Sequence, residues 1–164
     1  MDTSSGPDRG HTSEPERFEL EQFLPYRLSL LSNTVSQGIA QIYQKNHQLS
    51  IPEWRIMAVL GRYPDLTASQ LCERTVMDKV TVSRAVNSLL EKQYVHRITD
   101  SDDRRKRPLQ VTPGKGKALL DEVIPFALNY QTGLLDSLSV REQLQLNTLV
   151  EKLFSAAKRL NADH

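Results

Sequence analysis

The side chains with the clearest chemistry lie in one stretch of this 164-residue chain, residues 78–112. Its first half carries Val82, Val86, Leu89 and Leu90, which have the spacing of one buried helix face. The opposite face presents only hydrogen-bonding groups, with no apolar interruption: Lys79, Thr81, Ser83, Arg84 and Asn87. A polar helix face of this kind can contact base edges in the DNA major groove.

The second half of the stretch predicts a two-stranded hairpin with a basic tip. Residues 95–99 (VHRIT) and 108–112 (PLQVT) are plausible strands, and Pro108 restricts the second strand to a sheet edge. The turn between them holds four consecutive cations, Arg104, Arg105, Lys106 and Arg107. Cations on a projecting hairpin can contact phosphates and the minor groove. Helix and hairpin together predict a winged helix-turn-helix that binds DNA.

The distribution of charge supports this interpretation better than the total does. The whole chain has a formal net charge of only +1. Residues 74–117 hold eleven Lys or Arg against five Asp or Glu, so this segment is +6 and the remainder is −5. Segregation of positive charge is the electrostatic mark of a nucleic-acid-binding surface, although a basic run can also be a merely solvated face.

The elements that must position this stretch begin with three predicted helix starts. Residues 50–53 (SIPE), 67–70 (TASQ) and 139–142 (SVRE) all have the capping-box pattern. The first should start a helix that ends near Gly61, and the second a short helix with Leu71 and Cys72 facing inward. Asp78 should cap the helix that follows. Two short helices so close together, the second polar on its outer face, have helix-turn-helix spacing.

Long amphipathic helices are predicted at both ends of the chain. Residues 1–16 are polar and should form a disordered tail. A helix from Phe18 or Leu24 to Asn46 follows, with an apolar stripe at positions 24, 28, 31, 35, 39 and 42. Thr112-Pro-Gly should cap a further helix, which Pro125 should bend, and the last helix runs from the third capping box.

The terminal helices carry more apolar surface than the central domain could cover, which is typical of an interface. The simplest arrangement is a twofold dimer, and the alternative is a monomer whose arms fold onto its own core. We therefore predict a mainly α fold with a small β-wing, a winged helix-turn-helix plus N- and C-terminal dimerisation helices. The expected boundaries are 1–16 for the tail, 17–48 for the N-terminal dimerisation helix, 49–113 for the DNA-binding domain and 114–164 for the C-terminal dimerisation helices.

Other classes of protein find little support in the sequence. It has no Gly-rich phosphate loop, nucleophile elbow or clustered catalytic set, so we expect no enzyme and no cofactor. Four scattered histidines predict no metal site. The lone Cys72 fits a reducing compartment and is expected to be a buried structural thiol. With its polar start and no apolar run of ~18 residues, the chain is expected to be cytoplasmic, without a signal peptide and without a membrane partner.

Several strings in this order resemble the MarR family of bacterial transcription regulators. Residues 78–86 (DKVTVSRAV) are similar to the family's recognition helix. The run from Asp103 to Arg105, followed by Val111-Thr112-Pro113 and Gly116, is similar to its wing, with Val111 where the family normally has Leu. The resemblance covers about residues 20–160.

The resemblance implies a homodimer that binds a pseudo-palindromic operator as a repressor or an activator, a repressor being favoured. It also implies that Asp103 orients Arg105, which would enter the minor groove. From the residues themselves, Arg84 could fork onto guanine or pair with a carboxylate of its own helix. Thr81, Ser83 and Asn87 could touch bases or phosphates. The expected phosphate contacts are Lys79, Arg104, Lys106 and Arg107.

A small aromatic acid or phenolic compound is the effector class that the resemblance implies. Five residues are expected near the junction of the N-terminal dimerisation helix and the DNA-binding domain: Tyr26, Arg27, His47, Trp54 and Arg55. An arginine beside aromatic rings could hold an aromatic carboxylate. Trp54 is expected to belong to the core, and the alternative places it on the wall of a ligand pocket. Two alternatives stay open, a regulator that needs no ligand and a protein-interaction module of the same fold.

Overall fold

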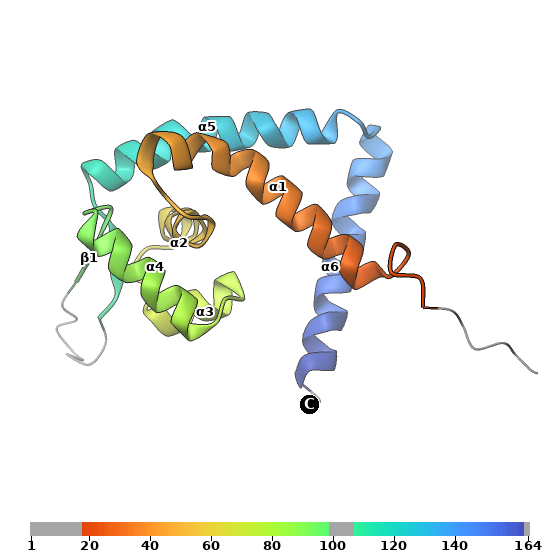
Figure 1. The fold of residues 1–164 in the computed structure, drawn as a ribbon, viewed down its shortest axis with the longest axis horizontal. Coiled ribbons are helices and arrows are strands. Elements are labelled where there is room, and N and C mark those ends of the chain that lie inside the picture. Colours follow the sequence, from red (N-terminus) through yellow and green to blue (C-terminus); the bar gives the residue numbers. More distant parts are fainter. Residues whose placement is uncertain (1–17, 99–106, 163–164) are drawn as a thin grey trace, which may run out of the picture. The chain divides into compact units, whose positions relative to one another are not determined.

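The computed structural model describes residues 18–98 and 107–162 (Figure 1). Six helices and two strands occur in this part of the chain: α1 (Leu24–His47), α2 (Ile51–Arg62), α3 (Ala68–Thr75), α4 (Lys79–Glu91), β1 (Val95–Arg97), β2 (Leu109–Val111), α5 (Lys115–Leu135) and α6 (Val140–Ala162). The chain divides after Val35 into two units, so that α1 crosses the boundary. The predicted mainly helical fold with a small β-wing is confirmed.

Local sequence signals set the starts of α2, α3 and α6. The Ser50 hydroxyl accepts the Glu53 backbone N–H, and the Glu53 carboxylate accepts the Ser50 N–H at 2.6 Å. Thr67 and Gln70 form the same reciprocal pair, as do Ser139 and Glu142. Each box satisfies N–H groups that the first helical turn leaves without a partner. All three predicted capping boxes are confirmed.

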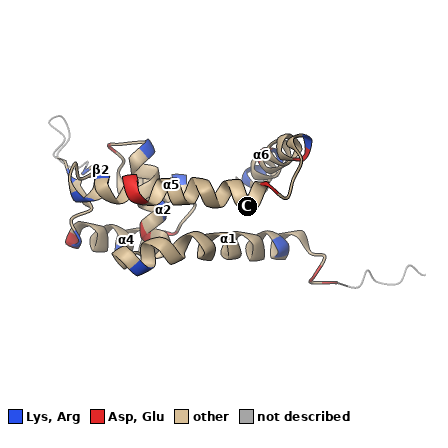
Figure 2. Cartoon of the chain, turned by 90° about the horizontal axis from the view of Figure 1, so that it is seen from above, with Lys and Arg blue, Asp and Glu red and all other residues tan. Residues whose placement is uncertain are grey.

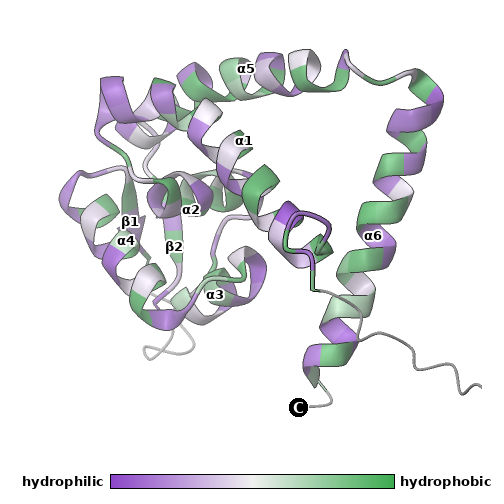
Figure 3. Ribbon diagram, turned by 45° about the vertical axis from the view of Figure 1, so that its right-hand side comes forward, coloured by the Kyte–Doolittle hydropathy of each residue, from purple (hydrophilic) through white to green (hydrophobic). Residues whose placement is uncertain are grey.

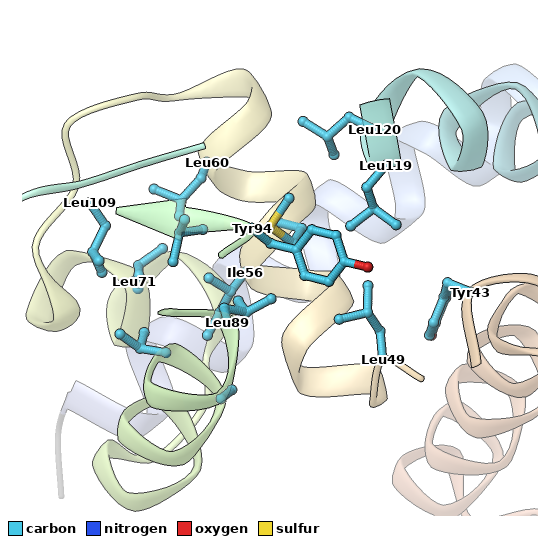
Figure 4. Packing of buried hydrophobic residues seen from close by; sticks show 14 of the residues in the cluster. Tyr43, Leu49, Ile56, Leu60, Leu71, Leu89, Tyr94, Leu109, Leu119 and Leu120 are labelled. Atoms are coloured by element: carbon cyan, nitrogen blue, oxygen red, sulfur yellow. The ribbon is translucent and has the colours of Figure 1, made fainter. Parts of the chain in front are cut away.

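The helices α2, α3 and α4 together form what we call the reading lobe. The hydrophobic core joins them to the wing and to the start of α5 (Figure 4). Ile56 and Leu60 of α2 meet Leu71 of α3 and Leu89 of α4, all of them almost fully buried. Leu109 of β2 is equally buried. Because every reading-lobe element contributes to one core, the orientation of α4 is fixed by packing from several sides.

The wing begins as a two-stranded antiparallel sheet that is shorter than the sequence predicts. Val95 pairs with Val111 and Arg97 with Leu109. An isolated bridge from Leu66 to Leu109 ties the wing to the loop before α3. The return strand ends at Val111, although the Thr112 backbone N–H still donates to the Tyr94 carbonyl oxygen. The Thr112 hydroxyl accepts the Gly116 N–H at 2.8 Å.

The start of α5 departs in detail from the predicted cap. The N-cap residue is Gly114, which makes no side-chain cap hydrogen bond, so the Thr112 hydroxyl supplies the cap from two residues upstream. Gly116 is required here because a Cβ atom would overlap the carbonyl oxygen of Tyr94. The helix then continues through Pro125 to Leu135.

Large apolar side chains stay exposed on the long helices. No residue of α6 is buried within the described chain, and Figure 3 shows hydrophobic segments recurring along this helix. Leu24, Leu28 and Leu31 of the predicted α1 stripe are also exposed. In the described residues, no helix has the combination of length and apolar character needed to cross a membrane.

The turn between α3 and α4 contains a strained residue. Val76 ends α3 in the left-handed region (φ 54°, ψ 34°) with 75% of its surface exposed. A β-branched side chain in this region costs about 1–2 kcal/mol. Replacing Val76 with glycine is expected to raise the free energy of unfolding by about 0.5–1 kcal/mol, because the relief of strain exceeds the added chain entropy of glycine.

Urea denaturation of the two proteins measures this difference. Val80→Gly is a suitable control, because Val80 is also exposed but lies within α4. There glycine should lower the stability by about 0.5–1 kcal/mol. A loss of stability in both variants would show that the turn at Val76 is not strained.

Candidate nucleic-acid interface

The reading helix α4 begins at a well-formed cap. Asp78 accepts the Thr81 backbone N–H at 2.9 Å and the Thr81 hydroxyl at 2.6 Å. These hydrogen bonds lower the pKa of Asp78, and the bond from the Thr81 side chain is the larger cause. Since the Thr81 hydroxyl donates its proton to the cap and Thr81 is half-buried, its first role is to fix the start of α4.

The two faces of α4 are sharply separated. Val82, Val86 and Leu89 are buried, as predicted, while Leu90 is half-buried and Ala85 joins the buried set. Of the predicted contact residues, four are exposed: Lys79, Ser83, Arg84 and Asn87. Val80, Arg84 and Asn87 follow one another at intervals of four and three residues. These three side chains therefore share the face directly opposite the core.

The prediction that this face has no apolar member is wrong. Val80 is 59% exposed and lies one turn before Arg84. Val80 was missed because the sequence analysis placed it on neither face, whereas Val82 and Val86 were assigned to the core by their spacing and do lie there. The signal that could have found it is its position, two residues before Val82 and therefore about 200° away around the helix.

A buried ion pair fixes the end of α4 to the start of α2. The Lys92 ammonium lies 2.7 Å from the Glu53 carboxylate and also donates to the Gln48 carbonyl oxygen. The Glu53 side chain is 5% exposed. Burial tends to raise the pKa of Glu53, but hydrogen bonds from Lys92 and Ser50 outweigh it and lower that pKa below its ordinary value. Glu53 therefore stays ionised and keeps both helices in register.

The wing carries further cations on either side of residues 99–106, which lie outside the described part of the chain. Arg97 at the end of β1 and Arg107 just before β2 are exposed. The predicted contacts Asp103, Arg104, Arg105 and Lys106 lie outside the described residues. Figure 2 shows the Lys and Arg residues of the described elements in blue, including those of α4.

The proposed effector residues fall into both units of the chain. Tyr26 and Arg27 belong to the first unit. In the second, Trp54 stacks on Tyr43 with ring centroids 5.4 Å apart and packs against the core, and Arg55 donates to the Ser36 hydroxyl at 3.3 Å. Burial raises the pKa of Tyr43 to about 12, although the Arg55 charge opposes this.

His47 takes part in a polar network that the sequence could not reveal. Its Nε2 lies 3.0 Å from Glu122 of α5, and its Nδ1 lies 3.3 Å from the Tyr94 hydroxyl. Asn46 also donates to Glu122 and is the main reason that the Glu122 pKa is lowered. The network therefore links the end of α1 to α5 and to the residue before β1.

The described chain has two surface concavities that these effector candidates do not line. One, of about 340 Å³, is lined by residues at the start of α2 and on α4. The other, of about 450 Å³, lies between the end of α2, β2 and the start of α5. None of Tyr26, Arg27, His47, Trp54 and Arg55 lines either of them. The described residues contain no group of three or more His, Cys, Asp or Glu that could hold a metal ion.

A capped reading helix packed on two shorter helices, followed directly by a β-hairpin, defines a winged helix-turn-helix protein. Residues 47–106 match the sequence model of the MarR family. The chain is thus similar to the MarR family in this segment, and the members of that family are DNA-binding transcriptional regulators.

Known relatives share this fold along most of the chain. The transcriptional regulator HosA of Escherichia coli is 25% identical over 133 residues, which are 76% of this chain and 98% of HosA. A MarR/EmrR family regulator from Acinetobacter sp. ADP1 matches with a TM-score of 0.79 and 25% identity, over 87% of this chain and 99% of that one. BpsR of Bordetella bronchiseptica has the same fold, with a TM-score of 0.72 and 20% identity over 83% of this chain and 96% of BpsR.

Proposed function

We propose that the chain binds a pseudo-palindromic operator as a homodimer, with α4 in the major groove and the wing on the flanking backbone. The observation that carries the proposal is the outward face of α4. It is capped, fixed by the core and by the Glu53–Lys92 pair, and exposes Arg84 and Asn87. An operator-bound dimer can exclude polymerase by its bulk alone. Repression therefore needs no contact with polymerase, unlike activation, and we propose a repressor.

The direct test is a titration with operator DNA and with a scrambled duplex of the same base composition. Specific binding should exceed binding to the scrambled duplex by at least about a thousandfold at physiological salt. Equal affinities that fall together with salt would indicate a charged surface without sequence reading.

The base contacts are assigned to Arg84 and Asn87, which share the outward face. Arginine can donate two hydrogen bonds to guanine O6 and N7, and asparagine can form a matching pair with adenine. Lys79 in the first turn and Ser83 are assigned to phosphates or neighbouring bases. Thr81 contributes through the Asp78 cap, so its contact to DNA is secondary.

The wing is proposed to contact the backbone and the minor groove. Arg105, held by Asp103, would enter the groove where negative potential is strongest. Arg104, Lys106 and Arg107 would neutralise phosphates.

Replacing Arg104 and Lys106 together with alanine is expected to flatten the dependence of log affinity on log salt by about two units. Each neutralised phosphate contributes about 0.9 to this slope. Fluorescence anisotropy with labelled operator at several salt concentrations measures it. Lys152 and Lys158 of α6 provide a control pair of the same charge change, and their replacement should leave the slope unaltered. An unchanged slope in the wing variant would mean that the wing does not touch DNA.

Dimerisation is proposed to bury the apolar faces of α1, α5 and α6. Exposed leucines and phenylalanines recur on all three helices, among them Leu28, Phe126, Leu149 and Phe154. Apolar patches of this extent usually mark an interface. A twofold dimer presents two copies of α4, which makes half-sites about one helical turn apart the expected operator geometry.

A small aromatic acid is proposed as the effector. DNA binding by the structural relative BpsR is regulated by 6-hydroxynicotinic acid, an aromatic compound with a carboxylate. Arg55 beside Trp54 and Tyr43 offers a cation next to stacked rings, which suits such a ligand. A panel of aromatic acids at saturating concentration should raise the midpoint of thermal unfolding for at least one member. No shift across the panel would favour regulation without a ligand.

A further inference from the structure

Val80 stands out on the proposed reading face because it is apolar and exposed. Its side chain is 59% exposed in the first turn of α4. Lys79 and Ser83 beside it are polar and exposed, and Arg84 lies one turn further along the same face. A valine at this position leaves apolar surface in water in the free protein, which is unfavourable by itself.

The fold gives Val80 no structural task. It is absent from the buried core and from the partly buried residues packed on that core. The start of α4 is secured by Asp78 and Thr81, and valine is a weaker helix former than Arg, Lys, Gln or Glu. An apolar side chain here suits an apolar group that covers the face when α4 is occupied.

The major groove offers one apolar group, the C5-methyl of thymine. N-terminal residues of a recognition helix are the ones that contact base edges, and Val80 is the second residue of α4. Val80 and Arg84 are separated by about 6 Å along the helix axis. Successive base pairs are about 3.4 Å apart, so the two side chains reach bases about one or two pairs from each other.

We propose that Val80 is a specificity-determining residue that contacts a thymine methyl about one or two base pairs from the base bound by Arg84. The inference rests on the proposed function, since it says which base pair of the operator one residue of the reading face contacts. The rival assignments are a contact between Val80 and a deoxyribose, which any sequence would provide, and no contact at all.

The test replaces each thymine of a selected operator half-site, one at a time, with deoxyuridine, which lacks only the methyl group. For the wild-type protein, one position is expected to weaken binding about fourfold, equivalent to the ~0.8 kcal/mol of one buried methyl group. For Val80→Ser the same replacement should change binding less than 1.5-fold, with all other positions unaffected. Val80→Ile keeps the apolar contact and should retain the loss at that position.

Each result either supports or overturns the assignment. A deoxyuridine effect that is the same in the wild type and in Val80→Ser overturns it, as does an operator without any sensitive thymine beside the Arg84 base. Equal thermal unfolding of the three proteins shows that the variants are folded. If selection of DNA fragments on the protein yields no preferred sequence, the proposed function itself fails. If it yields a specific operator whose binding does not depend on Val80, only the assignment of Val80 fails.

Discussion

Replacing Arg84 with alanine is expected to weaken operator binding by about 1–3 kcal/mol, roughly five- to 150-fold, and to relax the preference at one base position. Arg84 lies at the centre of the outward face of α4, and it forms no ion pair with a described carboxylate within 4.0 Å. Its guanidinium is thus available for a forked contact to guanine. Gel-shift titration against the operator and against variants at each position measures both effects.

Arg159→Ala is the matched control, because it removes the same charge from an exposed arginine in the last turn of α6. It should change operator affinity by much less and leave the base preference intact. If Arg84→Ala binds the cognate operator as tightly as the wild type, Arg84 is not a reader. A uniform loss for every sequence would instead assign Arg84 to a phosphate.

Replacing Lys92 with methionine is expected to lower the free energy of unfolding by about 2–3 kcal/mol. The substitution leaves the buried Glu53 carboxylate without its cation, and breaking a buried pair in this way commonly costs about 3–5 kcal/mol. Because Lys92 itself is 30% exposed, water compensates part of the loss. Chemical denaturation at pH 7 gives the difference between the two proteins.

The exposed pair Lys117–Asp121 supplies the control, with a separation of 2.8 Å and both side chains more than 60% exposed. Lys117→Met should cost less than about 1 kcal/mol. The Glu53 pKa is lowered in the fold, so the stability that its ionised form contributes is present above its ordinary pKa and is lost as the pH falls through the folded value. The penalty of Lys92→Met should shrink over the same range. Equal penalties for both lysine variants would contradict the role given to Glu53.

The sequence predicted best those features that depend on a few neighbouring residues. The capping boxes at Ser50, Thr67 and Ser139 depend on contacts three residues apart. The buried face of α4 follows from spacing alone, because the helix period is fixed. The wing strands are shorter than predicted, and strand propensity could not show that the Thr112 side chain caps α5.

Contacts between distant residues could not be read from spacing. His47 meets Glu122 across 75 positions of the sequence, and Lys92 meets Glu53 across 39. No local pattern encodes these pairs, because the tertiary fold brings them together. Val80 was missed for a different reason, since it was placed on neither face, although its angle on the helix puts it opposite the core.

Selecting genomic DNA fragments on the purified full-length chain tests whether two copies of α4 read an inverted repeat. We expect enrichment of one inverted repeat whose half-sites are centred about 10 base pairs apart. Fragments recovered without a common sequence, in proportion to their length, would contradict it. A single unrepeated site would contradict the twofold arrangement while leaving α4 as a DNA reader.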